Sequence, residues 1–190
     1  SQAKQCQLDP VPTWLVKRAG DILAPVIARM CNTSFQQSTL PANSKRAIVR
    51  PLLKKSSLDP NDPCSYRPIS NLSFVSKVVE KVVDARISSH TSKHNLLPVF
   101  QSAYRPIHST ETAVICVVNS MLSAMDQGHV GALMLLDLSA AFDTVDHGIL
   151  IDVMQHRFGV CGSALEWLAD FSTDRTQIVR AGGSECHKVR

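Results

Sequence analysis

Apolar residues recur at helical spacing in six stretches of the chain. Within each stretch they stand three or four residues apart, which places them on one face of a helix. We expect Ser109 or Thr110 to begin one of these helices as its cap and Asp146 to begin another. The pattern predicts helices over residues 12–19, 21–35, 74–90, 110–126, 146–158 and 162–171.

Two basic extended segments stand between the second and third of these helices. In residues 44–55, Ala47, Val49 and Leu52 alternate with basic residues, as in a strand with one solvated, positive face. Residues 56–65 hold two prolines and two aspartates, which predicts a loop, and residues 66–72 form a second extended segment. We interpret residues 44–72 as a mobile flap, the basic hairpin. Its cations can bind phosphates, and a solvated strand face explains them equally well. These cations are Lys45, Arg46, Arg50, Lys54, Lys55 and Arg67.

One continuous apolar run, Leu133–Leu136, leads directly into the acid Asp137. Such a run is typical of a strand buried on both faces, although periodicity alone does not exclude a helix. An acid at the exit of a buried strand can hold a metal ion or cap the next turn, and Asp137 taken alone favours the cap. Asp143 and Asp146 follow soon after, and we assign structural roles to both.

Composition sets wide limits on function. Lys and Arg outnumber Asp and Glu by 20 to 16, so the net charge of +4 permits a polyanionic partner without demanding one. The six cysteines have no CxxC spacing and follow no secretory signal, which predicts reduced thiols in an intracellular protein that is not secreted. We expect such a protein in the nucleus and cytoplasm. No apolar run approaches the roughly 18 residues of a membrane span. Because the chain begins at Ser1 and stops in a charged stretch, we expect it to be a piece of a longer protein.

Six short segments form a series whose order is more specific than any one of them. They are KRAIVRPLLKK at residues 45–55, SYRPISNL at 65–72, SKVVEK at 76–81, QSAYR at 101–105, HSTETA at 108–113 and LDLSAAFDTVDH at 136–147. This series resembles the reverse transcriptase of non-LTR retrotransposons of the jockey-like LINE type. The resemblance extends from Asp9 to about Val179.

The resemblance implies an α+β fold that is part of a right-hand polymerase. The chain would hold the fingers and the first part of the palm, with the thumb and the rest of the palm missing. Residues 1–40 would be a helical segment packed on the fingers, residues 41–128 the fingers with the basic hairpin, and residues 129–190 the start of the palm.

The resemblance also gives roles to the residues around Asp137. Asp137 would be the catalytic residue and would bind two Mg²⁺ ions, assisted by the carbonyl of Leu138. The backbone at Ala140 and Ala141 would approach the incoming triphosphate. Phe142 would lie under the sugar and exclude a 2′-hydroxyl, which selects deoxynucleotides.

The resemblance also gives the basic hairpin a role in holding the nucleotide. By the resemblance Arg67, and one of Lys54 or Lys55, would bind the triphosphate and neutralise charge in the transition state. Gln101–Arg105 would run beside the template, with no atomic role assigned.

The implied activity is RNA-directed DNA polymerase, with an RNA template, a DNA primer and deoxynucleoside triphosphates as partners and no membrane. The sequence lacks the family's Pro-Gln-Gly segment and its pair of adjacent aspartates, so we expect at most half a catalytic site and no activity of the piece alone. One alternative is a non-catalytic remnant that still binds nucleic acid, and another is a decayed fragment without function. The oligomeric state stays open.

Overall fold

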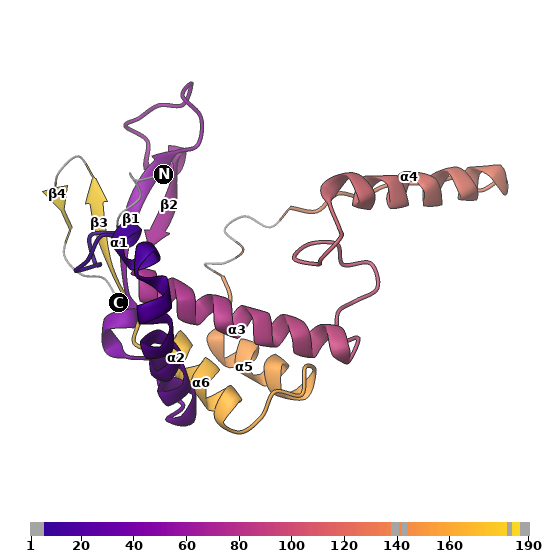
Figure 1. Cartoon of the computed structure of the whole chain (residues 1–190). Helices are drawn as coiled ribbons and strands as arrows, with labels where there is room; N and C mark the ends of the chain where they lie inside the picture. The colour runs from indigo at the N-terminus through magenta and orange to yellow at the C-terminus, as the bar shows by residue number, and fades with distance from the viewer. Residues whose placement is uncertain (1–5, 138–140, 142–143, 182–183, 187–190) are drawn as a thin grey trace. The chain divides into compact units, whose positions relative to one another are not determined.

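The computed structural model describes residues 6–137, 141, 144–181 and 184–186 (Figure 1). The chain forms two compact units, one made of Ser1–Ser89 with Asp146–Arg190 and the other of His90–Val145. Helices and strands are mixed along the chain, which confirms the α+β class. Among the described residues, every helix is too short or too polar to cross a membrane.

All six predicted helices are present, and each end lies within three residues of its predicted position. Asp146 caps the fifth helix as expected, because its Oδ1 accepts the amide hydrogen of Ile149 at 3.0 Å. Pro25 lies inside the second helix. The helices are α1 (Thr13–Arg18), α2 (Gly20–Gln36), α3 (Phe74–Lys93), α4 (Thr110–Asp126), α5 (His147–His156) and α6 (Ser163–Ser172), with short 3₁₀ turns at Ala42–Lys45 and Pro63–Ser65.

The first unit contains a four-stranded sheet in the order β2-β1-β3-β4. Strands β1 (Arg46–Leu53) and β2 (Tyr66–Asn71) are antiparallel neighbours, which confirms the basic hairpin. Strand β3 (Thr176–Ala181) pairs with β1 in parallel, with Arg46 opposite Thr176. A short strand β4 (Ser184–Glu185) follows it. The hairpin is therefore anchored to a segment more than 100 residues away in sequence.

Trp167 of α6 is the centre of the core of this unit. Its indole ring meets Phe35 edge-on, with ring centroids 5.5 Å apart, and stacks on Phe171 at 5.3 Å. Its Nε1 donates a hydrogen bond of 2.9 Å to Oγ of Ser34, so the one polar atom of this buried ring is satisfied. The buried residues of this cluster are Cys31, Leu40, Val79 and Trp167.

One helical turn beyond Trp167, Asp170 fixes the chain that leads into β1. Its carboxylate accepts the backbone N–H of Leu40 at 2.7 Å and the ammonium of Lys45 at 2.9 Å. Burial opposes ionisation of Asp170, but the hydrogen bonds from Lys45 and Leu40 and the charge of Lys45 together lower its pKa. Lys45 is buried in this ion pair, so counting it among the phosphate-binding cations of the hairpin was wrong.

The second unit is dominated by α4. Ser109 caps this helix in a reciprocal capping box with Thr112, in which each side chain accepts the other residue's backbone N–H. The strand expected at Leu133–Leu136 is wrong: residues 131–137 form neither helix nor strand, and Leu135 and Leu136 are 83% and 85% exposed. An extended segment becomes a strand only when its backbone groups pair with those of a neighbour, and an apolar composition does not supply that neighbour.

Candidate functional site

The pairing register of the basic hairpin decides which of its side chains share a face. Arg50 lies opposite Ile69, and Leu52 lies opposite Arg67. Since directly paired residues point to the same side of a sheet, these four side chains form a two-by-two array in which the arginines are diagonal neighbours. All four are exposed, Leu52 by 58% and Ile69 by 41%. We call this array the arginine face.

The composition of the arginine face differs from the predicted alternation. Leu52 was expected to point away from the basic residues, but it shares their side of the strand. Ile48 stands two residues before Arg50, so it points to the same side of β1, and it is buried. Ile48 therefore interrupts this side of β1, between the exposed Arg46 at its start and the arginine face in the distal half of the hairpin. There the arginine face combines two guanidinium groups with two apolar side chains, a surface suited to phosphates and flat apolar rings.

Lys54 and Lys55 follow β1 directly and are both exposed. Lys54 continues the ladder through its backbone N–H, which donates to the Ser65 carbonyl at 2.9 Å. Its ammonium donates to the Cys64 carbonyl at 2.8 Å, which leaves two of its three donors for a ligand. Lys54 is thus held beside the hairpin loop, one residue past the strand that carries Arg50.

The resemblance gives catalytic or nucleotide-binding roles to five residues from Asp137 to Phe142, and the structure describes two of them. Asp137 ends the irregular segment and is exposed, and Ala141 lies in a turn in which its carbonyl accepts the hydroxyl of Thr144 at 3.1 Å. Leu138, Ala140 and Phe142 lie outside the described residues. Asp137 and Ala141 belong to the second unit, and the basic hairpin belongs to the first.

The donor set around Asp137 fits a metal ion only in part. A carboxylate is the hard oxygen ligand that Mg²⁺ prefers, so Asp137 suits the ion as one ligand. A two-ion site needs several such groups. Over the part of the chain that the structure describes, no three His, Cys, Asp or Glu side chains gather closely enough to hold a metal.

The segment expected beside the template is a loop that Arg105 organises. The guanidinium of Arg105 donates to the carbonyls of Pro98 and Val99, both at 3.2 Å, and to that of Gln101 at 3.4 Å. Tyr104 has a positive φ of 58° and is 88% exposed. Arg105 therefore shapes the loop, and Tyr104 presents its ring to the outside.

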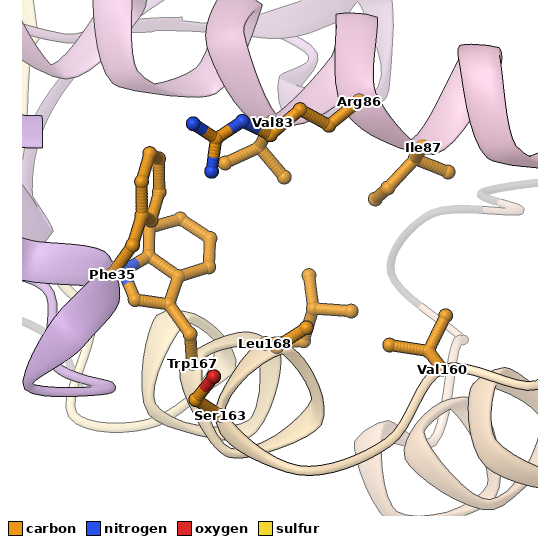
Figure 2. Close-up of a pocket in the computed structure, with 9 residues that line it drawn as sticks. Phe35, Val83, Arg86, Ile87, Val160, Ser163, Trp167 and Leu168 are labelled. Carbon is orange, nitrogen blue, oxygen red and sulfur yellow. The ribbon is translucent and has the colours of Figure 1, made fainter. Parts of the chain in front are cut away.

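The cavity between α2, α3 and α6 has no catalytic constellation. It has a volume of about 160 Å³, and its walls are mainly apolar side chains such as Val83, Ile87 and Leu168 (Figure 2). Its single charged lining residue is Arg86, whose guanidinium lies over the ring of Phe35 at 4.6 Å from the centroid. The cavity offers neither a nucleophile with an adjacent base nor a pair of acids.

Sequence reasoning counted Arg50 among the cations of the hairpin without assigning it to the nucleotide, and it missed Asp170. Arg50 shares the arginine face, but the face of a strand residue depends on a register that one sequence does not reveal. Asp170 carried a readable signal: it stands three residues after the buried Trp167, so it falls near the apolar side of α6, where a carboxylate requires a partner.

Comparison with known proteins defines the class. The family model described as reverse transcriptase (RNA-dependent DNA polymerase) matches residues 53–188, which is more than half of the chain. The chain belongs to the reverse transcriptase family. The match begins at the end of β1 and includes β2, Asp137 and β3.

Curated relatives place the chain among non-LTR retrotransposon proteins. It is 30% identical over 163 residues to a probable RNA-directed DNA polymerase from transposon BS of Drosophila melanogaster, covering 83% of this chain and 17% of the relative. It is 33% identical over 145 residues to a probable RNA-directed DNA polymerase from transposon X-element of the same fly, covering 74% and 16%.

A third relative is the RNA-directed DNA polymerase from mobile element jockey of Drosophila melanogaster, 32% identical over 121 residues, covering 64% of this chain and 13% of the relative. The chain therefore spans about a sixth of the length of these curated relatives.

Proposed function

We propose that this chain supplies the fingers and the opening part of the palm of an RNA-directed DNA polymerase. The observation that carries the proposal is the family match over residues 53–188, which takes in the second strand of the hairpin, with Arg67, and Asp137. In this arrangement residues 1–40 pack on the fingers, residues 41–128 are the fingers, and residues 129–190 begin the palm. The RNA template and the DNA primer would place the protein in the nucleus and cytoplasm.

The proposed nucleotide-binding surface is the arginine face with the lysines beside it. Arg67 holds the triphosphate through its planar fork of donors, which matches phosphate oxygens two at a time. Lys54 or Lys55 adds a second cation, and both are exposed. Arg50 is diagonal to Arg67 on the same face, so we add it to the set. These cations neutralise the charge that accumulates during phosphoryl transfer.

The proposed catalytic surface is the segment from Asp137 to Phe142. Asp137 would be a ligand of the catalytic Mg²⁺ ions, and the carbonyl of Leu138 would assist it. Bound divalent ions supply charge stabilisation to the attacking and leaving oxygens. The backbone of Ala140 and Ala141 approaches the triphosphate, where small side chains leave room. Phe142 excludes a 2′-hydroxyl and so selects deoxynucleotides.

The loop around Tyr104 is proposed to follow the RNA template. The exposed Tyr104 ring is able to stack on a base, a contact that tolerates any sequence. Arg105 is engaged with three carbonyls of its own loop, so its role is to hold this loop in shape.

Primer extension tests the catalytic half of the proposal. The 190-residue chain is incubated with a DNA primer on an RNA template, Mg²⁺ and deoxynucleoside triphosphates, beside Asp137→Asn. Asparagine keeps the shape of the side chain and removes its charge. Because the chain holds at most half of a catalytic site, we expect no product from either protein. Product that forms with the wild type and disappears with Asp137→Asn would contradict that expectation and would support Asp137 as a metal ligand. Product formed equally by both proteins refutes that role.

A further inference from the structure

An open groove lies between one face of α2 and one face of α3 in the first unit. Its volume is about 470 Å³. Along α2 its lining residues recur at each helical turn from Gly20 to Asn32. At 1.5 Å per residue, this part of the helix is roughly 18 Å long. The other wall is formed by α3 residues at intervals of four, namely Phe74, Val78, Val82 and Arg86.

Small residues keep the floor of the groove low. Gly20, Ala24 and Ala28 stand one helical turn apart on α2 and all line the groove. A Cβ placed on Gly20 would meet no atom within 4 Å, and Ala24 and Ala28 are exposed. The walls around them, including Leu23 and Ile27, are apolar and half-buried. The groove therefore has room for apolar side chains from another segment.

The charges that line the groove have one sign. Its charged lining residues are Lys17 and Arg86. At the Phe74 end of the groove, the carboxylate of Asp9 accepts the backbone N–H of Phe74 at 2.7 Å. Among the described residues no carboxylate forms an ion pair with Arg86. The guanidinium of Arg86 lies over the Phe35 ring, 4.6 Å from its centroid, and Arg86 lines both this groove and the cavity of Figure 2.

We propose that this groove docks an acidic, apolar helical segment of a partner protein. Apolar side chains spaced one turn apart fill the space above Gly20, Ala24 and Ala28, as helices do in apolar grooves. Carboxylates of the same segment pair with Lys17 and Arg86. The positive charge of the groove determines the partner's chemistry. A basic segment has the wrong sign of charge, and a polyphosphate backbone has no apolar side chains to fill the groove. None of the groove residues belongs to the basic hairpin, so this proposal does not depend on the role of the hairpin.

Synthetic peptides test the proposal directly on the 190-residue chain. The probe is a fluorescently labelled helical peptide of about twelve residues, the length that spans roughly 18 Å, with leucines on one face and glutamates beside them. A matched peptide carries lysine at every glutamate. Anisotropy titration is expected to show binding of the acidic peptide and at least roughly tenfold weaker binding of the basic one, which corresponds to about 1.4 kcal/mol.

Variants then locate the site. Arg86→Gln and Lys17→Gln are each expected to weaken the acidic peptide by roughly fivefold, the effect of losing one partly exposed ion pair. Ala28→Phe fills the groove from an exposed position and is expected to abolish binding while circular dichroism stays unchanged. Lys81→Gln, at an exposed position of α3 outside the groove lining, is expected to bind like the wild type.

Four outcomes would overturn the proposal. One is equal affinity for the acidic and basic peptides, and another is binding that survives Ala28→Phe. The third is no binding of the acidic peptide at about 1 mM, the weak end of specific association. The fourth is a wild-type dimer in sedimentation that Ala28→Phe dissociates, because the occupant would then be a second copy of this chain.

Discussion

Replacing Asp170 by asparagine tests the network that fixes the entry to β1. Asparagine has the same shape and retains a carbonyl oxygen for the Leu40 N–H, but it loses the charge that faces Lys45. The change therefore isolates the ion pair, whose side chains are only 9% and 28% exposed for Lys45 and Asp170.

The expected cost follows from the burial of the two partners. Removing one member of a fully buried ion pair typically costs about 3–5 kcal/mol, because the other charge is left without a partner. Solvent reaches part of Asp170, so we expect Asp170→Asn to lower the free energy of unfolding by about 2–3 kcal/mol. Asp170→Ala also removes the acceptor of the Leu40 N–H, which adds about 1 kcal/mol.

Urea denaturation followed by tryptophan fluorescence measures this cost. A Trp14→Phe background leaves the buried Trp167 as the reporter. The matched control is Asp152→Asn, which breaks the surface pair with His156, where both side chains are 69% exposed. We expect the control to change stability by less than about 0.5 kcal/mol. If Asp170→Asn were as mild as this control, the ion pair would not fix the strand entry as argued.

Three further predictions concern the same chain. The pKa of Asp170 is lowered in the folded protein, so its ionised form adds stability above the unfolded pKa of about 4, and this stability is lost as pH falls through the folded pKa. The difference in free energy of unfolding between wild type and Asp170→Asn should therefore close in acid. A constant difference from pH 7 to 3 would contradict this. Ser109→Ala removes the cap of α4 and should cost about 1 kcal/mol, seen as roughly fivefold faster hydrogen exchange at the Thr112 amide, whereas unchanged exchange would mean that the cap is not needed. Trp167→Phe keeps an aromatic ring but loses the donor to Ser34, and a loss of about 1–2 kcal/mol in urea denaturation is expected; no loss would show that this hydrogen bond adds no net stability.

The helices could be read from the sequence because their signals are local. The apolar spacing of α4 and its Ser109 cap lie within a few turns of one another, so both were predictable. The partner of β1 was not predictable, because Thr176–Val179 is distant in sequence and pairing leaves no mark in the hydrophobic pattern. The run at Leu133–Leu136 shows the same limit, since its composition favours a strand but strand formation requires a partner.

The site was predictable in its charges and not in their arrangement. The basic hairpin was evident from the density of Lys and Arg, but which side chains share its exposed face depends on the register of β1 with β2. Lys45 was wrongly grouped with the ligand-binding cations, because its partner Asp170 lies 125 residues away. The family match adds the polymerase class, which no single residue pattern establishes.

The most direct test of the central claim measures how the chain binds a deoxynucleoside triphosphate in the presence of Mg²⁺. Arg67→Ala is compared with the wild type, with Lys81→Ala as the charge-matched control and the unphosphorylated deoxynucleoside as the control ligand. If Arg67 holds the triphosphate, its loss should weaken binding at least roughly tenfold, as expected for hydrogen bonds to a charged group. The Lys81→Ala protein and the affinity for the bare nucleoside should stay unchanged. Equal triphosphate affinity in Arg67→Ala and Lys81→Ala would contradict the account.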